Sequence, residues 1–470
     1  MRVSPSSDAA AVAPFPDRPH LRNSRPLSWD RAPATPAARA ALAELLVQME
    51  AWEPRRRARR ADDRARLEAT LGAIALDLFA AAGEDAERWL AYSRRNADYE
   101  ALQRRYVHPE ATRTTVEAVV GFLEAGSYAE TRAGSYRRQA LGGGGYRSRL
   151  RATDRLVAYF AGRGIGLDDI GVREAAELVV LKGPAATRGG TKPLLGYDDT
   201  GETCRMREEL RAWSAVAQRH DIRPGGDRWD PMTRPLEDAD EGAGEAVELH
   251  RARLYRVFNN GSWRAGGRFY GGWWMTMPSA DRKRLTIDGE PVVELDFKAL
   301  HPRMAYHLAG WPLDLEDDPY DLGGAWAPVD RGAVKVAFNQ LLAVGPGAGI
   351  RRPADLVLPR GRSYGDLLAA LEAKHEAIRP WLRSARALEL QNLDSRIAAG
   401  VLAYFTARGR PVLPVHDSFV VAARDEYKLG ETMFLAYRAV LSDRGGVAAW
   451  PVVKGWSGTG VEERVRGVLC

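Results

Sequence analysis

The segment Val292–Gly310 constrains the fold of this chain more than any other stretch. Its first residues, Val-Val-Glu-Leu, are mostly apolar and β-prone, and they predict a buried strand. Leu300, Met304 and Leu308 then recur at four-residue spacing, which predicts a helix directly after the strand. Asp296 lies at the join, where a strand would hold its carboxylate in the fixed geometry that suits a metal ligand. The same residue could instead cap the helix, and this segment alone leaves both interpretations open.

A second acid occupies a comparable position further along the chain. The segment Val412–Ala423 predicts two strands joined by a tight turn, with His416 and Asp417 at the turn. Both strands are apolar, and a buried strand gains no stability from presenting a carboxylate. We therefore predict that Asp417 partners Asp296. Two aspartates on adjacent strands can hold two divalent cations, Mg²⁺ with Mn²⁺ as an alternative, about 3.5–4 Å apart.

A pair of cations completes this candidate site. A helix from about Val329 would carry Arg331 and Lys335 four residues apart, hence on one face. Two cations on one face repel each other unless an anion lies opposite, and a triphosphate would fit. The alternative is a solvent-exposed basic face. Combined with the paired aspartates, the arrangement describes nucleotidyl transfer, in which Lys and Arg neutralise charge on the triphosphate.

The composition is that of a globular protein with an anionic partner. Lys and Arg total 68 against 62 acids, a formal charge of +6 at pH 7, so the placement of charge matters more than the net. The two cysteines, Cys204 and Cys470, exclude a disulfide framework and favour a reducing, cytoplasmic environment. No apolar run of about 18 residues and no signal-peptide segment occurs, so we expect no membrane association.

Four regions are expected along the chain. Residues 1–36 are rich in Ala, Pro, Ser and Arg without periodicity and are predicted to be a disordered tail. A helical and winged-helix nucleic-acid-binding region is expected over 37–165, with apolar stripes typical of helices. Residues 166–247 are less informative and form a connecting or thumb-like region. The remaining segment, 248–470, carries the chemistry.

The winged-helix interpretation rests on residues 112–160. A helix over 112–125, with Gly126 as its C-cap, precedes a short strand over 127–130 and a glycine-rich tip at 142–145. The arginines that would line this wing are Arg137, Arg138, Arg147, Arg149 and Arg151. Such wings commonly contact phosphates, which positions a protein without reading sequence. A protein-binding winged helix, or a loop without a ligand, is the alternative.

Another nucleic-acid signal lies at the start of the C-terminal region. A helix carrying Arg251, Arg253 and Arg256 is expected to lead into the segment 259–274. That segment mixes glycines with Arg268 and several aromatic residues, a mixture that suits a nucleic-acid strand because phosphates meet Arg and bases stack on rings. A tryptophan-rich turn in the core is the alternative.

The order of these segments resembles the family A polymerases, which include bacterial repair-type DNA polymerases and phage-type single-subunit RNA polymerases. The sequence GGRF at Gly266–Phe269 is similar to the family's T-G-R-L segment. Asp296 falls on the first metal-binding aspartate of motif A, and the pair His416 and Asp417 matches motif C. The resemblance covers about residues 250–425.

Motif B and the segment before motif C extend the resemblance. Arg331 and Lys335 keep the four-residue spacing of the motif B cations that contact the incoming triphosphate. Gln391 falls in a helix like the family's Gln segment. His301 lies where the DNA enzymes have a glutamate and the RNA enzymes a glycine, so it is assigned to the nucleotide while the choice of sugar stays open. Arg268, Gln391 and His416 are assigned to nucleic acid on the same grounds.

The resemblance implies an α+β fold: a polymerase palm, which is an antiparallel sheet with flanking helices, plus the N-terminal α-helical and winged-helix region. It also implies a compact, phage- or mobile-element-like template-dependent polymerase that uses two Mg²⁺ ions. The implied partners are a primer–template duplex, nucleoside triphosphates and a replication partner protein. DNA and RNA products stay equally open.

Departures from the family pattern leave two alternative functions open. Asn339 and Ala343 stand where motif B has an aromatic residue and Tyr-Gly, and Ser418 replaces an acid. The missing motif B aromatic residues favour a catalytically inactive, polymerase-like DNA-binding protein of replication or regulation, whereas the retained aspartates, Lys335 and Arg331 oppose it. A nuclease using the same two aspartates would need further carboxylates, of which Glu294 is the one expected on the same face as Asp296.

Overall fold

The computed structural model describes residues 23–53, 55, 57–96, 99, 105–106, 111–136, 145–173, 177–185, 192–223, 253–311, 313–353, 356–442 and 451–457. The chain divides into two compact units. The first consists of residues 1–102, 107–176 and 236–246, and the second of residues 103–106, 177–235 and 247–470. The segment 177–223 therefore belongs to the same unit as the candidate site, and the four regions expected from the sequence remain a prediction.

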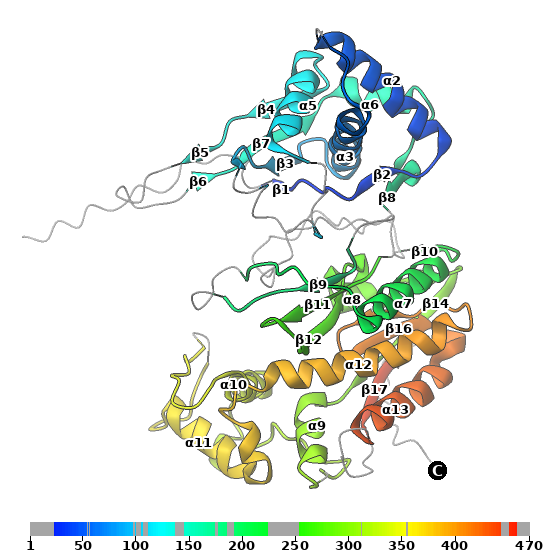
Figure 1. Ribbon diagram of the computed structural model, residues 1–470. Coiled ribbons are helices and arrows are strands. Elements are labelled where there is room, and N and C mark those ends of the chain that lie inside the picture. The colour runs from blue at the N-terminus through cyan, green and yellow to red at the C-terminus, as the bar shows by residue number, and fades with distance from the viewer. Residues whose placement is uncertain are drawn as a thin grey trace, which may run out of the picture. The chain divides into compact units, whose positions relative to one another are not determined.

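The first unit combines helices with a small sheet (Figure 1). Its helices are α2 (Pro36–Trp52), α3 (Ala61–Glu84), α5 (Arg113–Ala125) and α6 (Asp154–Ala161). Its four-stranded sheet has the order β1 (Ser24–Pro26), β3 (Trp89–Tyr92), β7 (Ser148–Ala152), β4 (Ala129–Arg132), and β2 (Arg31–Pro33) pairs with β8 (Ile170–Val172). The predicted apolar stripe of α3, including Leu71 and Ile74, is fully buried in the core of this unit.

The expectation of a disordered tail over 1–36 is wrong for its last part, because β1 and β2 lie there. Arg25 and Arg31 of these strands both bind the buried carboxylate of Asp77, at 2.8 and 3.1 Å. Burial raises the pKa of Asp77, but the two guanidinium charges outweigh it and leave that pKa lowered. A partner about fifty positions away in the sequence explains why the segment itself shows no periodic pattern.

The helix and hairpin expected near residue 112 are present in part. Helix α5 begins after a capping box at Thr112 and ends at Gly126, as predicted. Strands β4 and β7 are antiparallel, and a second antiparallel pair, β5 (Ser135–Tyr136) with β6 (Gly145–Tyr146), follows them outward. Arg137, Arg138 and most of the glycine-rich tip lie outside the described residues. The winged-helix assignment stays a prediction.

The second unit is built on an antiparallel sheet of six strands. Its order is β10 (Ile222–Arg223), β13 (Thr286–Ile287), β14 (Glu290–Phe297), β16 (Ser418–Ala422), β15 (Leu413–Val415), and β17 (Val453–Ser457) pairs with β14. A smaller sheet has the order β12 (Ser262–Tyr270), β11 (Tyr255–Asn259), β9 (Val179–Leu181). The helices are α7 (Gly201–Ala217), α8 (Ser279–Arg282), α9 (Leu300–Leu308), α10 (Arg331–Ala343), α11 (Tyr364–Lys374), α12 (Ala387–Thr406) and α13 (Glu426–Ser442).

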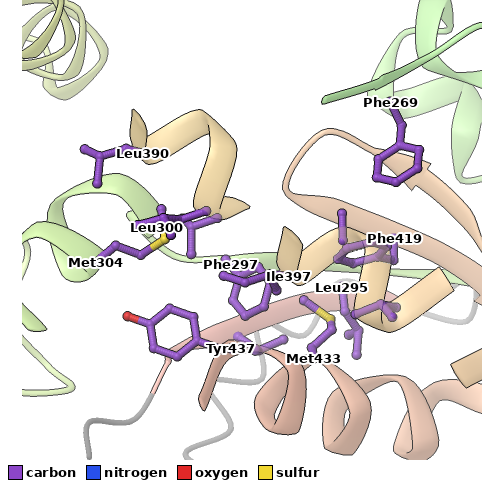
Figure 2. Close-up of a cluster of buried hydrophobic side chains, with 14 of the residues drawn as sticks. Phe269, Leu295, Phe297, Leu300, Met304, Leu390, Ile397, Phe419, Met433 and Tyr437 are labelled. Carbon is purple, nitrogen blue, oxygen red and sulfur yellow. The ribbon is translucent and has the colours of Figure 1, made fainter. Parts of the chain in front are cut away.

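The core of this unit fixes which face of β14 carries the candidate site. Figure 2 shows Leu295 and Phe297 of β14 among buried side chains from α9, α12 and α13, with Phe419 of β16 beside Leu295. Side chains alternate along a strand, so Asp296 points to the opposite face from Leu295 and Phe297. The α+β fold class expected from the sequence is therefore correct, with an antiparallel sheet and flanking helices around the acid.

Two local expectations in this unit have different outcomes. The Asp288–Gly289 turn is confirmed, since both residues have positive φ angles and join β13 to β14. The helix expected to carry Arg256 is wrong, because residues 255–259 form strand β11. The side chain of Arg256 is buried there and donates to Gly267 O at 2.8 Å and Ser395 Oγ at 3.1 Å.

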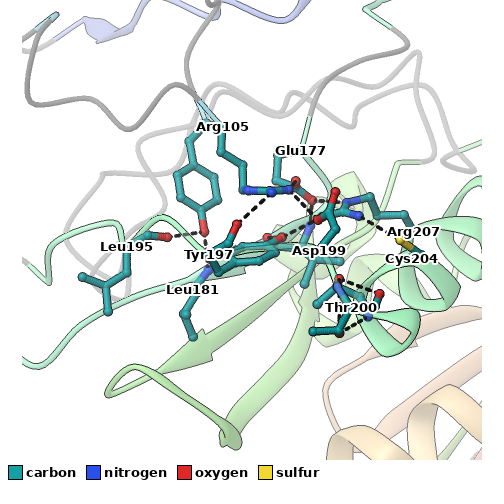
Figure 3. A network of polar contacts seen from close by, with 12 residues as sticks. Arg105, Glu177, Leu181, Leu195, Tyr197, Asp199, Thr200, Cys204 and Arg207 are labelled. Atoms are coloured by element: carbon teal, nitrogen blue, oxygen red, sulfur yellow. Dashed lines mark hydrogen bonds and ion pairs between the residues drawn. The ribbon is translucent and has the colours of Figure 1, made fainter.

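A network of ion pairs ties the edge of the smaller sheet to α7 (Figure 3). Arg105 and Arg207 both bind Glu177, which precedes β9, at 2.9 and 2.8 Å. Asp199 lies between the same two guanidinium groups, at 2.9 and 2.5 Å. Two cations balanced by two carboxylates make this a structural network, which holds α7 against the sheet.

No helix of the described residues is long and apolar enough to cross a membrane.

Candidate carboxylate pair and its surroundings

The structure brings Asp296 and Asp417 to the same end of two neighbouring strands. Asp296 of β14 is in register with Ser418 of β16, and Asp417 is the residue just before β16. The backbone N–H of Phe297 donates to Asp417 O at 3.3 Å. His416 has a φ of +58°, which tightens the turn that presents Asp417. Helix α9 has Ala299 at its N-cap, so the alternative that Asp296 caps this helix is wrong.

Asp296 is partly buried and lies close to other acids, and both effects raise its pKa. Burial raises its pKa to about 7, and the charge of Asp417 and then that of Glu294 contribute in the same direction. Lys454 of β17 opposes the shift, since its Nζ lies 3.5 Å from Asp296 Oδ2. One partly exposed ammonium group leaves the repulsion between the two acids incompletely balanced, and a bound cation would relieve it.

Glu294, two residues before Asp296 on the same strand, is occupied by other partners. Arg282 of α8 binds both of its oxygens at 3.1 Å, and Ser418 Oγ donates to it at 2.5 Å. Its side chain is buried. Within the part of the chain that the structure describes, no group of three or more His, Cys, Asp and Glu side chains gathers to hold a metal. The protein therefore offers a pair of carboxylates at this point.

A second buried acid, Asp394, contacts two residues that the sequence assigns to the site, Arg268 and His301. Asp394 of α12 is fully buried, and its Oδ2 accepts from Arg268 Nε and Nη2 at 2.9 and 2.5 Å. His301 Nε2 lies 3.1 Å from the same oxygen. Burial raises the pKa of Asp394, but the charge of Arg268 and the contact with His301 outweigh it, and the pKa is lowered. Asp394 was not singled out from the sequence, although a carboxylate on the apolar side of a helix is a usable signal.

Arg268 also lies within electrostatic reach of the acid pair. Burial lowers its pKa, but Asp394 and then Asp417 outweigh this effect, and the pKa is raised. Tyr270 lies on β12 with Arg268. The ring of His416 packs edge-on against the ring of Tyr270, with centroids 5.8 Å apart. The structure thus places Arg268 within electrostatic reach of Asp417, with His301 beside Arg268 and His416 next to Asp417 in the turn.

Helix α12 packs against β12, the strand that contains GGRF, and its side chains bind the backbone of that strand. Asn392 Nδ2 donates to Trp263 O and Gly266 O at 3.0 and 3.1 Å, and Ser395 Oγ donates to Gly266 O at 3.3 Å. Gly267 has a φ of +92°, and a Cβ there would lie 2.7 Å from the Phe258 ring and 2.9 Å from Ser395 Oγ. A side chain cannot fit at this position, so the glycine sets the register that presents Arg268. Gln391 lies in α12, half-buried, three residues before Asp394.

The cations of α10 differ in their surroundings. Arg331 binds Asp318 at 2.5 and 3.1 Å and lies 5.0 Å above the ring of Tyr320. Burial raises the pKa of Tyr320, and the charges of Asp318 and then Asp417 add to this shift. Lys335 is exposed one turn later and has no ion-pair partner among the described residues.

The predicted wing arginines lie in the first unit. Arg151 of β7 binds Glu87 and Glu130 and lies 5.1 Å above the Trp89 ring, which balances its charge within the fold. Arg149 Nε donates to Ser24 Oγ at 3.0 Å, and Arg147 accepts a hydrogen bond from Arg149 at its backbone carbonyl. Contact of these three residues with nucleic acid stays a prediction.

Comparison with known proteins gives little. No protein-family description and no curated protein matches the chain. Among solved structures, the chain is similar to the POL domain of Pol1 from M. smegmatis in complex with a DNA primer-template and dNTP. The match has a TM-score of 0.29 and 12% identity, and it covers 44% of this chain and 48% of that structure, about half its length.

Proposed function

We propose that the second unit is a template-dependent nucleotidyltransferase whose reaction centre is the pair Asp296 and Asp417. The observation that carries the proposal is that β14 and the turn before β16 bring both carboxylates to the same end of neighbouring strands, where burial and the charge of Asp417 raise the pKa of Asp296 to about 7. Crowded acids of this kind mark functional sites more often than structural ones. The polymerase motifs in the sequence support the same reaction, because they occur in the order that the family shows.

The donor set fits divalent cations such as Mg²⁺. Two carboxylates with incompletely balanced charge are hard oxygen ligands, and water and phosphate oxygens would complete the coordination. When bound, the ions would activate the attacking hydroxyl and stabilise the leaving pyrophosphate. Asp296 and Asp417 would hold them, and β14 and β16 fix the positions of both carboxylates.

The surrounding side chains have separate roles in this proposal. Lys335 is exposed and has no carboxylate partner among the described residues, so it is available to a triphosphate, and Arg331 would exchange Asp318 for the same anion. Arg268 and His301 are held by Asp394 beside the acid pair and would position the nucleic acid and the nucleotide.

One observation favours a second candidate, a non-catalytic nucleic-acid-binding protein. Lys454 already supplies a positive charge to Asp296 from β17. A protein without catalytic metals would need such a counter-ion. A nuclease is disfavoured, because Glu294 is bound by Arg282 and Ser418 and adds no free carboxylate to the pair.

Primer extension tests the proposal directly. Purified protein is incubated with a primer–template, Mg²⁺ or Mn²⁺, and either dNTPs or rNTPs in separate tubes, beside Asp417→Asn. We expect extension in one tube and its loss by at least about a thousandfold in the variant, since a metal ligand contributes several kcal/mol to the transition state. The productive tube identifies the product as DNA or RNA. No extension on any template, with retained nucleic-acid binding, would support the non-catalytic candidate instead.

A further inference from the structure

One segment of the second unit carries a marked excess of positive charge. Residues 331–386 contain ten Lys and Arg against four Asp and Glu, so their formal charge of +6 equals that of the whole chain. The ten are Arg331, Lys335, Arg351, Arg352, Arg360, Arg362, Lys374, Arg379, Arg383 and Arg386. The rest of the chain is therefore balanced overall. Concentrated charge of one sign is the footprint of a polyanion site.

Most of these cations lack a carboxylate partner. Arg331, Arg383 and Arg386 form ion pairs, with Asp318, Glu372 and Glu389. By contrast, Lys335 and the four arginines between α10 and α11 are exposed and make no ion pair within the residues that the structure describes. We call these five the basic surface: Lys335, Arg351, Arg352, Arg360 and Arg362. Exposed cations elsewhere in the second unit differ, because Arg223, Arg410, Arg424 and Lys428 each bind a carboxylate.

The connection between α10 and α11 is packed against the rest of the second unit. Tyr364, at the start of α11, donates from its hydroxyl to Gln340 Oε1 in the second half of α10 at 2.6 Å. Arg362 lies 5.7 Å above Trp326, which precedes α10. Figure 1 shows α10 and α11 side by side, and Leu356 anchors the connection in the core. The four arginines therefore lie on a packed segment whose end, at Tyr364, contacts α10.

Apolar side chains lie among these charges. Val336 is 45% exposed on α10, and Val357 is 81% exposed between Arg352 and Arg360. A single strand offers both phosphates for the cations and unpaired bases for apolar surface, whereas a duplex hides its bases.

We propose that the basic surface binds single-stranded nucleic acid through its phosphates, without reading sequence. The proposal rests on the proposed function in the choice of nucleic acid as the polyanion. Helix α10 has 13 residues and a length of about 20 Å at ~1.5 Å per residue, so a strand must be several nucleotides long to cover this surface. Binding is therefore expected to strengthen with strand length and to level off once the strand covers this surface.

The test replaces Arg351, Arg352, Arg360 and Arg362 with Gln in one full-length protein. Binding of a labelled single-stranded DNA of about 20 nucleotides is followed by fluorescence anisotropy at several KCl concentrations. We expect at least a tenfold loss of affinity near 100 mM KCl and a decrease of about three in the slope of log affinity against log salt, at ~0.7 per phosphate contact. The matched control replaces Arg223, Arg410, Arg424 and Lys428 with Gln, and we expect its affinity to stay within about twofold of the parent protein.

Each outcome decides the proposal, provided that circular dichroism shows both variants folded. Equal losses in the two variants would mean that charge alone acts, and an unchanged affinity in the first would also overturn the proposal. Vesicles with anionic lipid provide a further arm, since loss of vesicle binding with unchanged DNA binding would assign the surface to a membrane. Loss of DNA binding in a protein that never extends a primer would retain this inference and reject the nucleotidyltransferase. Normal primer extension, combined with unchanged DNA binding in the variant with four substitutions, would support the nucleotidyltransferase and reject this inference.

Discussion

At the scale of single residues, Lys454 is the contact that most affects metal binding. Its Nζ lies 3.5 Å from Asp296 Oδ2, where a divalent cation would compete with it. We expect Lys454→Met to raise the affinity for Mn²⁺ by up to about fivefold, because a partly exposed ion pair contributes about 0.2–1 kcal/mol. The binding is measured by electron paramagnetic resonance at about pH 8.5, where Asp296 is ionised. Asp417→Asn is the control that should abolish binding, and an unchanged or lower affinity in Lys454→Met would show that the lysine does not compete.

The sequence predicted the two aspartates but could not predict the residues that tune them. Asp296 and Asp417 each lie within a local pattern of strand and turn that a reader can recognise. Lys454 is 158 positions from Asp296, and Asp394 is 126 positions from Arg268, so each meets its partner through sheet register or helix packing. Such contacts depend on tertiary structure, which no local pattern records.

At the scale of elements, the packing of α12 against β12 should depend on Gly267. A Cβ there would meet Phe258 at 2.7 Å and Ser395 at 2.9 Å, and its φ of +92° is unfavourable for any side chain. We expect Gly267→Ala to lower the free energy of unfolding by about 2–4 kcal/mol, from backbone strain and overpacking together. Urea denaturation measures the change.

Gly289→Ala is the matched control for this substitution. Its φ is +77°, but nothing lies within 4 Å of the added Cβ, so about 1–2 kcal/mol of backbone strain is expected there. The difference between the two variants reports the contact with α12. Equal losses in both would mean that α12 does not constrain the GGRF strand.

Elements with strong local signals were predictable, and those defined by distant partners were not. The strand before Asp296, the helix after it and the turn at Asp288 follow from alternation, four-residue spacing and an Asp-Gly pair. The strand at 255–259 was misread as a helix, because its charges suggested an exposed face while Arg256 is in fact buried. Pairing with β9 and β12 decides its conformation, and neither neighbour is visible in the local pattern.

At the scale of the whole molecule, two buried histidines should make stability depend on pH. Burial lowers the pKa of both His307 and His375 to about 4, from about 6.5 in the unfolded chain. Below pH 6.5 the unfolded chain therefore binds more protons, and stability falls as the pH drops towards 4. The expected loss between pH 7 and pH 5 is about 2 kcal/mol for each histidine. Asp296 acts in the opposite direction, because its raised pKa makes the folded state bind a proton first.

The contribution of a histidine to the pH dependence of stability is therefore measured by comparing a variant without that histidine with the parent protein. His375 Nδ1 lies 3.0 Å from the Tyr306 hydroxyl and its Nε2 lies 2.9 Å from Pro319 O, contacts that a glutamine amide can replace without a titratable group. We expect His375→Gln to lose about 2 kcal/mol less than the parent protein when urea denaturation is compared at pH 7 and pH 5. The effect of Asp296 is common to both proteins and cancels. An identical pH dependence in the two would mean that His375 does not stay neutral in the folded state.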